Sequence, residues 1–252
     1  MSKVKLKILG VWDLTEAPLT LGRLLLFIEE LQIQRVISQA GDIEVAILGD
    51  STREPEPSLT SVLMGLENVV GYYRKNSLKD LSDFLDLRDY VIWPPLQGGK
   101  HIPTSTLLIQ QFYREYQYIP LLSCKKKLLD WGQNYFSRLG IGCPVIVHLK
   151  NNPQQHGCSN ARQDVWFNFF KSCRADDVAF VLIGDDVVDT KITALKHVVR
   201  SKLGGSDLAQ DLALIQLGSF FMGMASGPCN MAILNTRPFV IYKNPEHDTE
   251  EM

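Results

Sequence analysis

The sequence predicts an α/β protein made of two domains, each built around a parallel β-sheet. Short runs of β-branched and apolar residues alternate with longer segments of helical periodicity, which is the pattern of parallel βαβ units. This alternation occurs once in each half of the chain, and 252 residues are enough for two such domains. No internal sequence repeat relates the two halves, which share only their plan.

The first half predicts three strands and their connecting helices. Residues 4–11 have strand alternation, and residues 20–37 repeat apolar side chains at helical spacing. The apolar stripe of this helix comprises Leu21, Leu24, Leu25, Ile28 and Leu31, and the opposite face carries Arg23, Glu29, Glu30 and Gln32. Residues 44–48 and 89–93 are expected to be strands and residues 61–70 a short helix. Residues 52–58 and 97–101 are expected to be loops, the former because of Pro55 and Pro57.

The second half repeats this plan more clearly. Helices are expected over residues 123–139, 164–173, 190–199 and 207–217, and a last helix from Asn230. Strands are expected at residues 144–149, 178–183, 220–222 and 238–242. Val165, Phe169 and Phe170 are predicted to form the buried side of the helix over residues 164–173. The halves join near residues 100–125, so the predicted domains are residues 1–115 and 116–252.

Composition and charge exclude several classes of protein. Apolar residues make up 45% of the chain and charged residues 21%, as in an ordinary globular protein and unlike a collagen, a coiled coil or a disordered tail. The formal net charge is −2, so the chain as a whole is not drawn to nucleic acid, and no nucleic-acid partner is predicted. No apolar run is long enough for a transmembrane segment, and the N-terminus has the pattern of a strand and not of a signal peptide.

The cysteine pattern favours free thiols. The chain has five cysteines, which are far apart and include no Cys-x-x-Cys pair. This pattern predicts neither a disulfide framework nor a zinc site, and it favours a reducing cytoplasm. No metal and no cofactor are predicted.

The most informative segment is the turn from Gly223 to Pro228. A very short strand runs into Gly223, a Ser226-Gly227-Pro228 turn follows, and a helical pattern comes next. Small residues let backbone amides approach a phosphate, and a helix N-terminus adds a partial positive charge. A tight strand-to-helix turn without any ligand explains the same residues, and the local sequence leaves both interpretations open.

Other polar residues follow the predicted strands, where ligands bind in open parallel sheets. Lys150, Asn151 and Asn152 come directly after the strand that holds His148, and a cation with amides suits a diphosphate. His148 itself fits a satisfied core histidine as well as a ligand-binding one. Gly184-Asp185-Asp186 suits a metal or a ribose, but it is equally typical of a turn and helix cap.

Familiar motifs of other enzyme classes are absent. Gly98-Gly99-Lys100 lacks the remaining residues of a P-loop, and no Gly-x-Gly-x-x-Gly follows the first strand. Ser226 lies in Met-Ala-Ser-Gly-Pro, which is not the Gly-x-Ser-x-Gly elbow of a hydrolase. The sequence therefore favours neither an ATPase, nor an ordinary dehydrogenase, nor a serine hydrolase.

The segment Phe220–Pro228, followed by Met231–Leu234 and the strand Arg237–Tyr242, resembles the sugar-nucleotide-binding segment of GT-B glycosyltransferases. The likeness is strongest to heptosyltransferase-like and related bacterial surface-polysaccharide transferases, in which a Gly-x-x-Ser-Gly turn holds the donor diphosphate. Pro144–Asn151 is similar to the first strand of their C-terminal domain, and Val178–Asp185 to the next strand and its glycine. Pro18–Leu25 is similar to their first helix, which faces the acceptor.

This resemblance implies two Rossmann-like α/β/α domains, with the acceptor on the N-terminal and the donor on the C-terminal one. It implies metal-independent transfer, inverting or retaining, from a nucleotide-diphosphate sugar to a hydroxyl of a glycan, a lipid-linked acceptor or another molecule. The donor-binding residues that it implies are His148, Lys150, Asn151, Gly184, Asp185, Gly223, Ser226, Gly227 and Pro228. Gly22 and Arg23 are implied on the acceptor side, and Asp13 and Glu16 are the carboxylates placed for a catalytic base.

The chain departs from the family pattern at three places. Arg23 follows Gly22 where these enzymes often have an acid, and Asn230 stands where they commonly have a histidine. The sequence ends ten residues after Tyr242, so the C-terminal helices of the fold are expected to be short or missing. The first and the last of these departures favour an alternative, a non-catalytic module that binds a nucleotide sugar or a glycan, or that pairs with an active subunit. An unrelated α/β protein, flavodoxin-like or periplasmic-binding-like, is the third possibility, and strand order distinguishes it.

Overall fold

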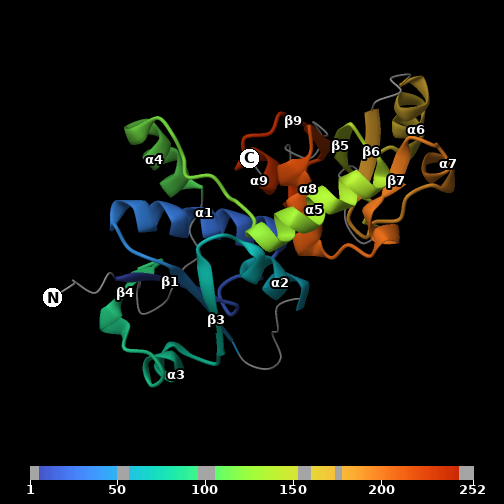
Figure 1. Cartoon of the computed structure of the whole chain (residues 1–252). Helices are drawn as coiled ribbons and strands as arrows, with labels where there is room; N and C mark the ends of the chain where they lie inside the picture. The colour runs from blue at the N-terminus through green and yellow to red at the C-terminus, as the bar shows by residue number, and fades with distance from the viewer. Residues whose placement is uncertain (1–5, 50–56, 96–105, 153–159, 174–177, 244–252) are drawn as a thin grey trace. The chain divides into compact units, whose positions relative to one another are not determined.

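The computed structural model describes residues 6–49, 57–95, 106–152, 160–173 and 178–243 of the chain. The chain divides into two compact units, Met1–Ser123 and Cys124–Met252, and each holds one parallel sheet (Figure 1). The predicted domain boundary, between residues 115 and 116, lies in the last helix of the first unit, α4 (Leu107–Tyr116). Among the described residues, no helix is both long enough and apolar enough to cross a membrane.

The first unit has a four-stranded sheet in the order β3-β2-β1-β4, with every neighbouring pair parallel. Its strands are β1 (Lys7–Asp13), β2 (Ile43–Leu48), β3 (Val69–Lys75) and β4 (Tyr90–Trp93). Its helices are α1 (Leu21–Ile37), α2 (Pro57–Gly65), α3 (Leu78–Ser82) and α4, with a 3-10 turn at Leu87–Asp89. Helix α1 begins at the N-cap Thr20, whose side chain accepts a hydrogen bond from the Arg23 amide.

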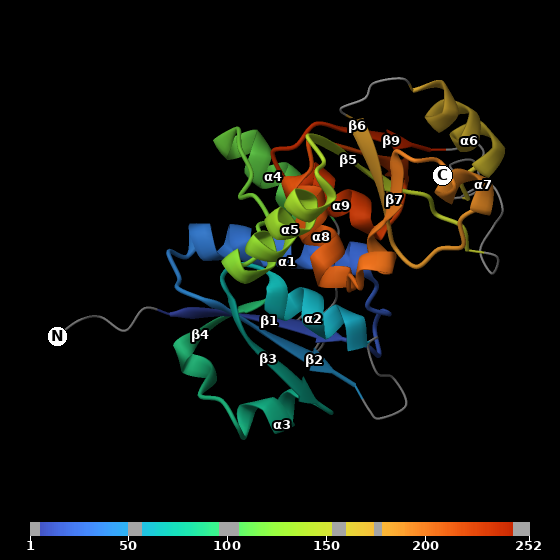
Figure 2. The ribbon, with the colours of Figure 1, turned by 45° about the vertical axis from the view of Figure 1, so that its right-hand side comes forward.

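The two faces of this sheet are covered by different helices (Figure 2). Gly10 of β1 lets α1 approach closely, because a Cβ there would lie 2.4 Å from the Leu31 side chain. On the opposite face, Leu9, Val11, Ala46 and Leu48 pack with Leu81 of α3 in one apolar core.

The structure corrects several expectations for the first unit. Strand β3 was not predicted, and the helix expected over residues 61–70 is α2, which ends at Gly65. Helix α4 lies in the stretch that was expected to join the two halves. The supposed polar face of α1 is buried at Glu29, Glu30 and Gln32. Of the two expected loops, residues 97–101 and most of 52–58 lie outside the described residues, while residues 57 and 58 belong to α2.

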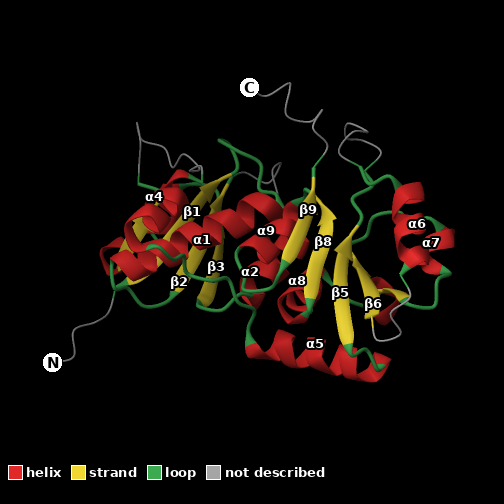
Figure 3. Cartoon of the chain, turned by 90° about the horizontal axis from the view of Figure 1, so that it is seen from above, coloured by secondary structure: helices red, strands yellow, loops and turns green. Residues whose placement is uncertain are grey.

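The second unit has a five-stranded parallel sheet in the order β7-β6-β5-β8-β9. Figure 3 shows β6, β5, β8 and β9 side by side. The strands of this unit are β5 (Cys143–His148), β6 (Val178–Ile183), β7 (Val198–Arg200), β8 (Phe220–Met224) and β9 (Phe239–Tyr242). Its helices are α5 (Lys126–Leu139), α6 (Gln163–Ser172), α7 (Thr190–Thr193), α8 (Leu208–Leu217) and α9 (Gly227–Ile233), with a 3-10 turn at Ser201–Gly204. One apolar core joins α6 and α7 to a face of β5, β6 and β8 through Trp166, Phe170, Ile192, Val147, Leu182 and Met222.

Three expectations for the second unit are also corrected. The helix expected over residues 190–199 is a single turn, α7, and its C-terminal part is instead the edge strand β7. Helix α9 begins at Gly227, three residues before the expected Asn230. In α6 the buried side chains are Trp166 and Phe170, whereas Val165 is 51% and Phe169 38% exposed. The described cysteines, Cys124, Cys143, Cys173 and Cys229, are free thiols, and residue 158 lies outside the described residues.

Candidate functional site

The carboxyl edge of the second sheet has a topological switch point between β5 and β8. After β5 the chain adds β6 and β7 on one side, and then it returns to add β8 and β9 on the other side. The loops after two such strands run in opposite directions, so a crevice forms between them. In open parallel sheets, ligands bind in this crevice. The predicted residues of the second unit follow β5, β6 and β8 at this edge.

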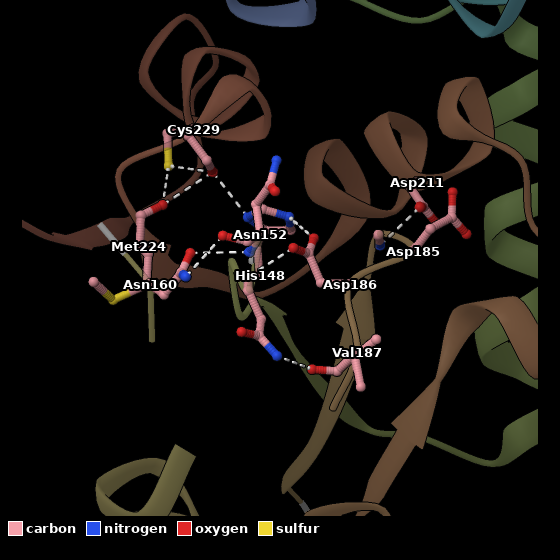
Figure 4. A network of polar contacts seen from close by, with 12 residues as sticks. His148, Asn152, Asn160, Asp185, Asp186, Val187, Asp211, Met224 and Cys229 are labelled. Atoms are coloured by element: carbon pink, nitrogen blue, oxygen red, sulfur yellow. Dashed lines mark hydrogen bonds and ion pairs between the residues drawn. The ribbon is translucent and has the colours of Figure 1, made fainter. Parts of the chain in front are cut away.

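His148 is the centre of the polar contacts at this edge (Figure 4). It is the last residue of β5 and is only 5% exposed. Its Nδ1 lies 2.8 Å from Oγ of Ser226, and its Nε2 lies 3.2 Å from Oδ2 of Asp186. One buried imidazole therefore joins the loops that follow β5, β6 and β8.

Asp186 fixes the loop after β5 to the loop after β6. Its Oδ1 accepts a hydrogen bond from the Asn151 amide at 2.6 Å, and the Asn151 side chain donates to the carbonyl of Val187 at 2.7 Å. Burial by itself would raise the pKa of Asp186, but the hydrogen bonds from His148 and the Asn151 amide outweigh it and lower that pKa. Asp186 is thus a half-buried, ionised carboxylate that anchors two loops.

Gly184 and Gly223 leave room for His148. Gly184 has φ +86°, and a Cβ there would lie 3.0 Å from the His148 ring. A Cβ at Gly223 would lie 2.6 Å from the His148 carbonyl oxygen. Gly223 was predicted because it would admit a phosphate, and Gly184 as part of a segment suited to a metal, a ribose or a turn. The structure adds the packing of His148 as a reason for both glycines.

Ser226 is the N-cap of α9, but its side chain does not cap that helix. Its hydroxyl faces His148 and donates to the carbonyl of Met224 at 3.0 Å. Gly227 and Pro228 begin the helix, where Pro228 has no N–H and the Cys229 N–H donates to the Ser226 carbonyl at 3.1 Å. The predicted turn therefore exists, with the serine hydroxyl directed toward the protein.

Asp211 of α8 is a polar anchor that sequence analysis missed. It is 1% exposed, and its carboxylate accepts from the hydroxyls of Ser201 and Ser206 and from the Gly184 amide. Its Oδ2 also lies 3.2 Å from Nζ of Lys202. The aspartate lies in an apolar helical stretch, and that interruption is the signal that would have identified it. It holds the loop after β6 in place.

Asp185, which is among the implied donor-binding residues, and its neighbour Asp186, which is not, have different surroundings. The Asp185 side chain is 87% exposed and lies 3.6 Å from Lys202 Nζ, outside the His148 contacts. Lys150 lies two residues after the end of β5 and is half-exposed, and its carbonyl accepts a hydrogen bond from the Ala161 amide at 2.7 Å. The structure thus brings together His148, Asn151, Gly184, Gly223 and Ser226 and places Lys150, Gly227 and Pro228 beside them along the chain.

The candidates of the first unit lie at an equivalent place in their own sheet. The order β3-β2-β1-β4 has its switch point between β1 and β4, and Asp13 ends β1. Asp13 is half-buried, and its Oδ1 accepts from the amide and the hydroxyl of Thr15 at 2.8 and 2.7 Å. Glu16 is exposed in the following turn.

Gly22 and Arg23, which the resemblance implies on the acceptor side, lie in the first turn of α1. The Arg23 guanidinium is exposed and donates to the carbonyl of Pro18 at 3.1 Å. Within the described parts of the chain, no group of three or more His, Cys, Asp or Glu side chains is arranged to hold a metal ion.

Comparisons with known proteins identify the fold. No protein-family model matches the chain, and no curated protein matches it either. A glycosyl transferase of family 9 from Veillonella parvula has 12% sequence identity and a TM-score of 0.61 over 93% of this chain and 79% of its own. The ADP-heptose LPS heptosyltransferase II of E. coli has 14% identity and a TM-score of 0.59, covering 94% of this chain and 84% of its own.

A third similar structure is the E. coli heptosyltransferase WaaC with ADP. It has 9% identity and a TM-score of 0.58 over 94% of this chain and 87% of its own. The chain therefore has the two-domain α/β fold of GT-B glycosyltransferases, as its resemblance to the heptosyltransferase-like enzymes predicted.

Proposed function

We propose that the protein is a glycosyltransferase that moves a sugar from a nucleotide-diphosphate sugar to a hydroxyl of a glycan or lipid-linked acceptor, without a metal ion. The observation that carries this proposal is the set of polar groups at the switch point between β5 and β8, centred on His148. The fold supports it, because the similar structures are glycosyltransferases and one of them is a heptosyltransferase with ADP.

The donor diphosphate is assigned to the turn Gly223–Pro228 and to Lys150. The Ser226 hydroxyl does not cap the first turn of α9, where Pro228 has no N–H and the Cys229 N–H donates to the Ser226 carbonyl at 3.1 Å. The Gly227 N–H is therefore the group of this turn that we assign to the anion. Lys150 supplies a cation on the adjacent loop, which the bonds between Asn151 and Asp186 hold in place. One preorganised donor of this kind stabilises a developing charge by roughly 3 to 4 kcal/mol.

The remaining donor-side residues shape the crevice. His148 and Asn151 hold the three loops in register through Ser226 and Asp186. Gly184 and the exposed Asp185 lie on the loop after β6, where a carboxylate suits a ribose hydroxyl.

The acceptor and the catalytic base are assigned to the first unit. Asp13 is the stronger base, because it ends β1 at the switch point of its sheet and keeps a half-buried carboxylate there. Glu16 is the second choice, and Gly22 and Arg23 border the same loop. The cytoplasm is the compartment that we propose, since it suits both nucleotide sugars and four free thiols.

A thermal-shift screen with nucleoside diphosphates tests the donor site. A diphosphate at 100 times its dissociation constant is expected to stabilise the protein by about 2.7 kcal/mol. Lys150→Ala is expected to weaken this response about tenfold in affinity, and Lys127→Ala, which changes an exposed lysine of α5, is expected to leave it unchanged. A folded protein that responds to none of the diphosphates would contradict the proposal.

A non-catalytic module that binds nucleotide sugars is the second candidate. It is favoured by the two hydrogen bonds that Asp13 Oδ1 accepts from Thr15, since they give this carboxylate a structural role in the turn. Slow hydrolysis of a bound nucleotide sugar separates the two functions. If the protein is an enzyme, Asp13→Asn is expected to lower turnover by at least about a hundredfold while the diphosphate affinity stays unchanged. Donor binding with no turnover by the unmodified protein would establish the module.

A further inference from the structure

A cavity of about 330 Å³ lies on the α6 side of the second sheet, apart from the contacts of His148. Its walls are apolar: Val165, Trp166 and Phe169 come from α6, and Met224 and Tyr242 end β8 and β9. Its volume falls in the range of small-molecule sites.

The cavity follows from the topology of the sheet. The core on this face joins α6 and α7 to β5, β6 and β8, whereas the register places Met224 beside Tyr242 and Met222 beside Val240 at the β9 edge. In the described part of this edge, Val240 is 40% and Tyr242 44% exposed. Apolar side chains thus line the gap between α6 and the last two strands.

Aromatic contacts shape the walls of the cavity. The rings of Trp166 and Tyr242 meet edge to face with centroids 5.3 Å apart, and Trp166 also meets Phe169 at 5.9 Å. Val165 and Phe169 are 51% and 38% exposed on the helix side, although this helix packs against a core. An elongated apolar group in the cavity would remove these side chains from water.

The polar residues of the cavity lie together at its mouth. Asn160 and Arg162 precede α6, and Lys243 follows β9, so all three lie at the carboxyl edge of the sheet. Asn160 is held in place by reciprocal hydrogen bonds of 2.9 Å with the backbone of Asn152 (Figure 4). The Arg162 guanidinium lies 3.0 Å from the carboxylate of Asp164, so the described charges at the mouth are the two cations Arg162 and Lys243 and this one carboxylate.

We propose that this cavity binds a single-chain lipid phosphate, with its apolar chain between α6 and strands β8 and β9 and its phosphate between Arg162 and Lys243. Two cations at the mouth of an apolar cavity complement a multiply charged head on an uncharged chain. The mouth also lies near the proposed donor site, since Met224 lines the cavity and its carbonyl accepts from Ser226. The binding proposal stands without the donor proposal.

Calorimetric titration of the full chain with decyl phosphate below its micelle concentration tests the site. Decyl phosphate is expected to bind at least about tenfold more tightly than decanol, decanoate or inorganic phosphate. If decanol bound as tightly as decyl phosphate, the role of the charged mouth would be refuted. If decanoate bound as tightly, the preference for a phosphate would be refuted. If inorganic phosphate bound as tightly, the role of the apolar cavity would be refuted.

Paired variants locate the binding. Val165→Asp places a carboxylate in the wall and is expected to weaken decyl phosphate binding about tenfold, whereas Leu203→Asp, at an exposed position away from the cavity, is not. Arg162→Glu is expected to weaken it similarly, and Arg138→Glu on α5 to leave it unchanged. If each cavity variant and its control lost the same decyl phosphate affinity, the assignment of the binding site to this cavity would be overturned. The nucleoside diphosphate response of Val165→Asp is expected to persist, so failure of one proposal is distinguishable from failure of the other.

Discussion

Gly223 illustrates how single residues set the geometry of the candidate site. Its missing side chain lets β8 lie against the backbone of His148, because a Cβ would be 2.6 Å from the carbonyl oxygen and 3.1 Å from the amide nitrogen. Neither of those atoms can move without disturbing the pairing of β5 and β8.

Gly223→Ala is therefore expected to destabilise the protein by about 1 to 3 kcal/mol and to weaken nucleoside diphosphate binding. Gly140→Ala is the matched control, since Gly140 has φ +63° but nothing within 4 Å of an added Cβ. It is expected to cost about 1 kcal/mol of backbone strain and to leave binding intact. Chemical denaturation measures both costs, and unaltered diphosphate binding by Gly223→Ala would contradict the packing argument.

Glu29 is a second residue whose surroundings determine its behaviour. It is 0% exposed in α1, and within the described residues neither carboxylate oxygen has a hydrogen-bond partner. Burial raises its pKa from 4.5 to about 8, and burial likewise raises the pKa of Glu30 to about 7 despite the hydrogen bond from Trp93. The native state therefore holds a proton on Glu29 in a pH range where the unfolded chain releases it.

This difference makes stability depend on pH. Because the native state binds more protons than the unfolded state between pH 4.5 and 8, the free energy of unfolding is expected to fall as pH rises through that window, by about 4 kcal/mol from Glu29. Glu29→Gln is expected to remove most of this fall and to leave a smaller one from Glu30. Glu67→Gln, at an exposed position of the same unit, is the control. Identical pH profiles for Glu29→Gln and the unmodified protein, from urea unfolding, would refute the assignment.

At the scale of elements, α8 holds the loops of the second unit together through Asp211. The four polar partners of Asp211 come from the loop that follows β6 and from the connection between β7 and α8. Removing the charge leaves Lys202, whose side chain is 18% exposed, without its buried partner. Asp211→Asn is expected to cost about 3 kcal/mol of stability.

Asp207→Asn is the matched control on the same helix, because asparagine also caps a helix and the exposed Asp207 is the N-cap of α8. Its expected cost is below about 0.5 kcal/mol. Thermal unfolding of both variants measures the difference, and equal stability would show that Asp211 does not anchor these loops.

How far the sequence predicts these elements depends on what holds each of them. Apolar periodicity placed α1, β2, β6 and α8 within one residue of their observed ends, because these elements are fixed by burial of their own side chains. Strand β3 escaped prediction because it is an edge strand with mostly half-buried residues. Its Tyr73 donates to Glu44 of β2, together with Tyr90 and Lys7, and such a contact between distant strands leaves no local pattern.

The candidate site shows the same division. Small residues and their positions after strands identified Gly184, Gly223 and Ser226, because turns of this kind have strong local signatures. The contact of Asp186 with His148 was not predicted, and Asp211 was missed altogether, because the partners of both carboxylates, His148 and the Gly184 amide, are distant in the sequence. The predicted buried side of α6 is wrong by one residue at Val165, because Val165 and Trp166 are both apolar and only packing against the sheet determines which of them is buried.

At the scale of the whole molecule, two parallel sheets each present a switch point with ionisable residues beside it. In the proposed function, the nucleotide part of the donor binds to residues of the second unit alone. Hydrogen exchange with a saturating nucleoside diphosphate is expected to slow amides at residues 148–151 and 223–227 by about tenfold and to leave residues 13–17 unchanged. Protection confined to residues 13–17 would reverse the assignment of donor and acceptor.

The order of strands in the second sheet has a consequence for synthesis on the ribosome. Strand β5 emerges first, β6 and β7 follow within a short stretch, and its other neighbour, β8, is translated only after α8. At about 5 to 20 residues per second, one side of β5 stays unpaired for several seconds, with its hydrogen-bonding groups exposed. The crevice around His148 therefore cannot form in the nascent chain until β8 docks, so the chain becomes able to bind only after β8 has been translated.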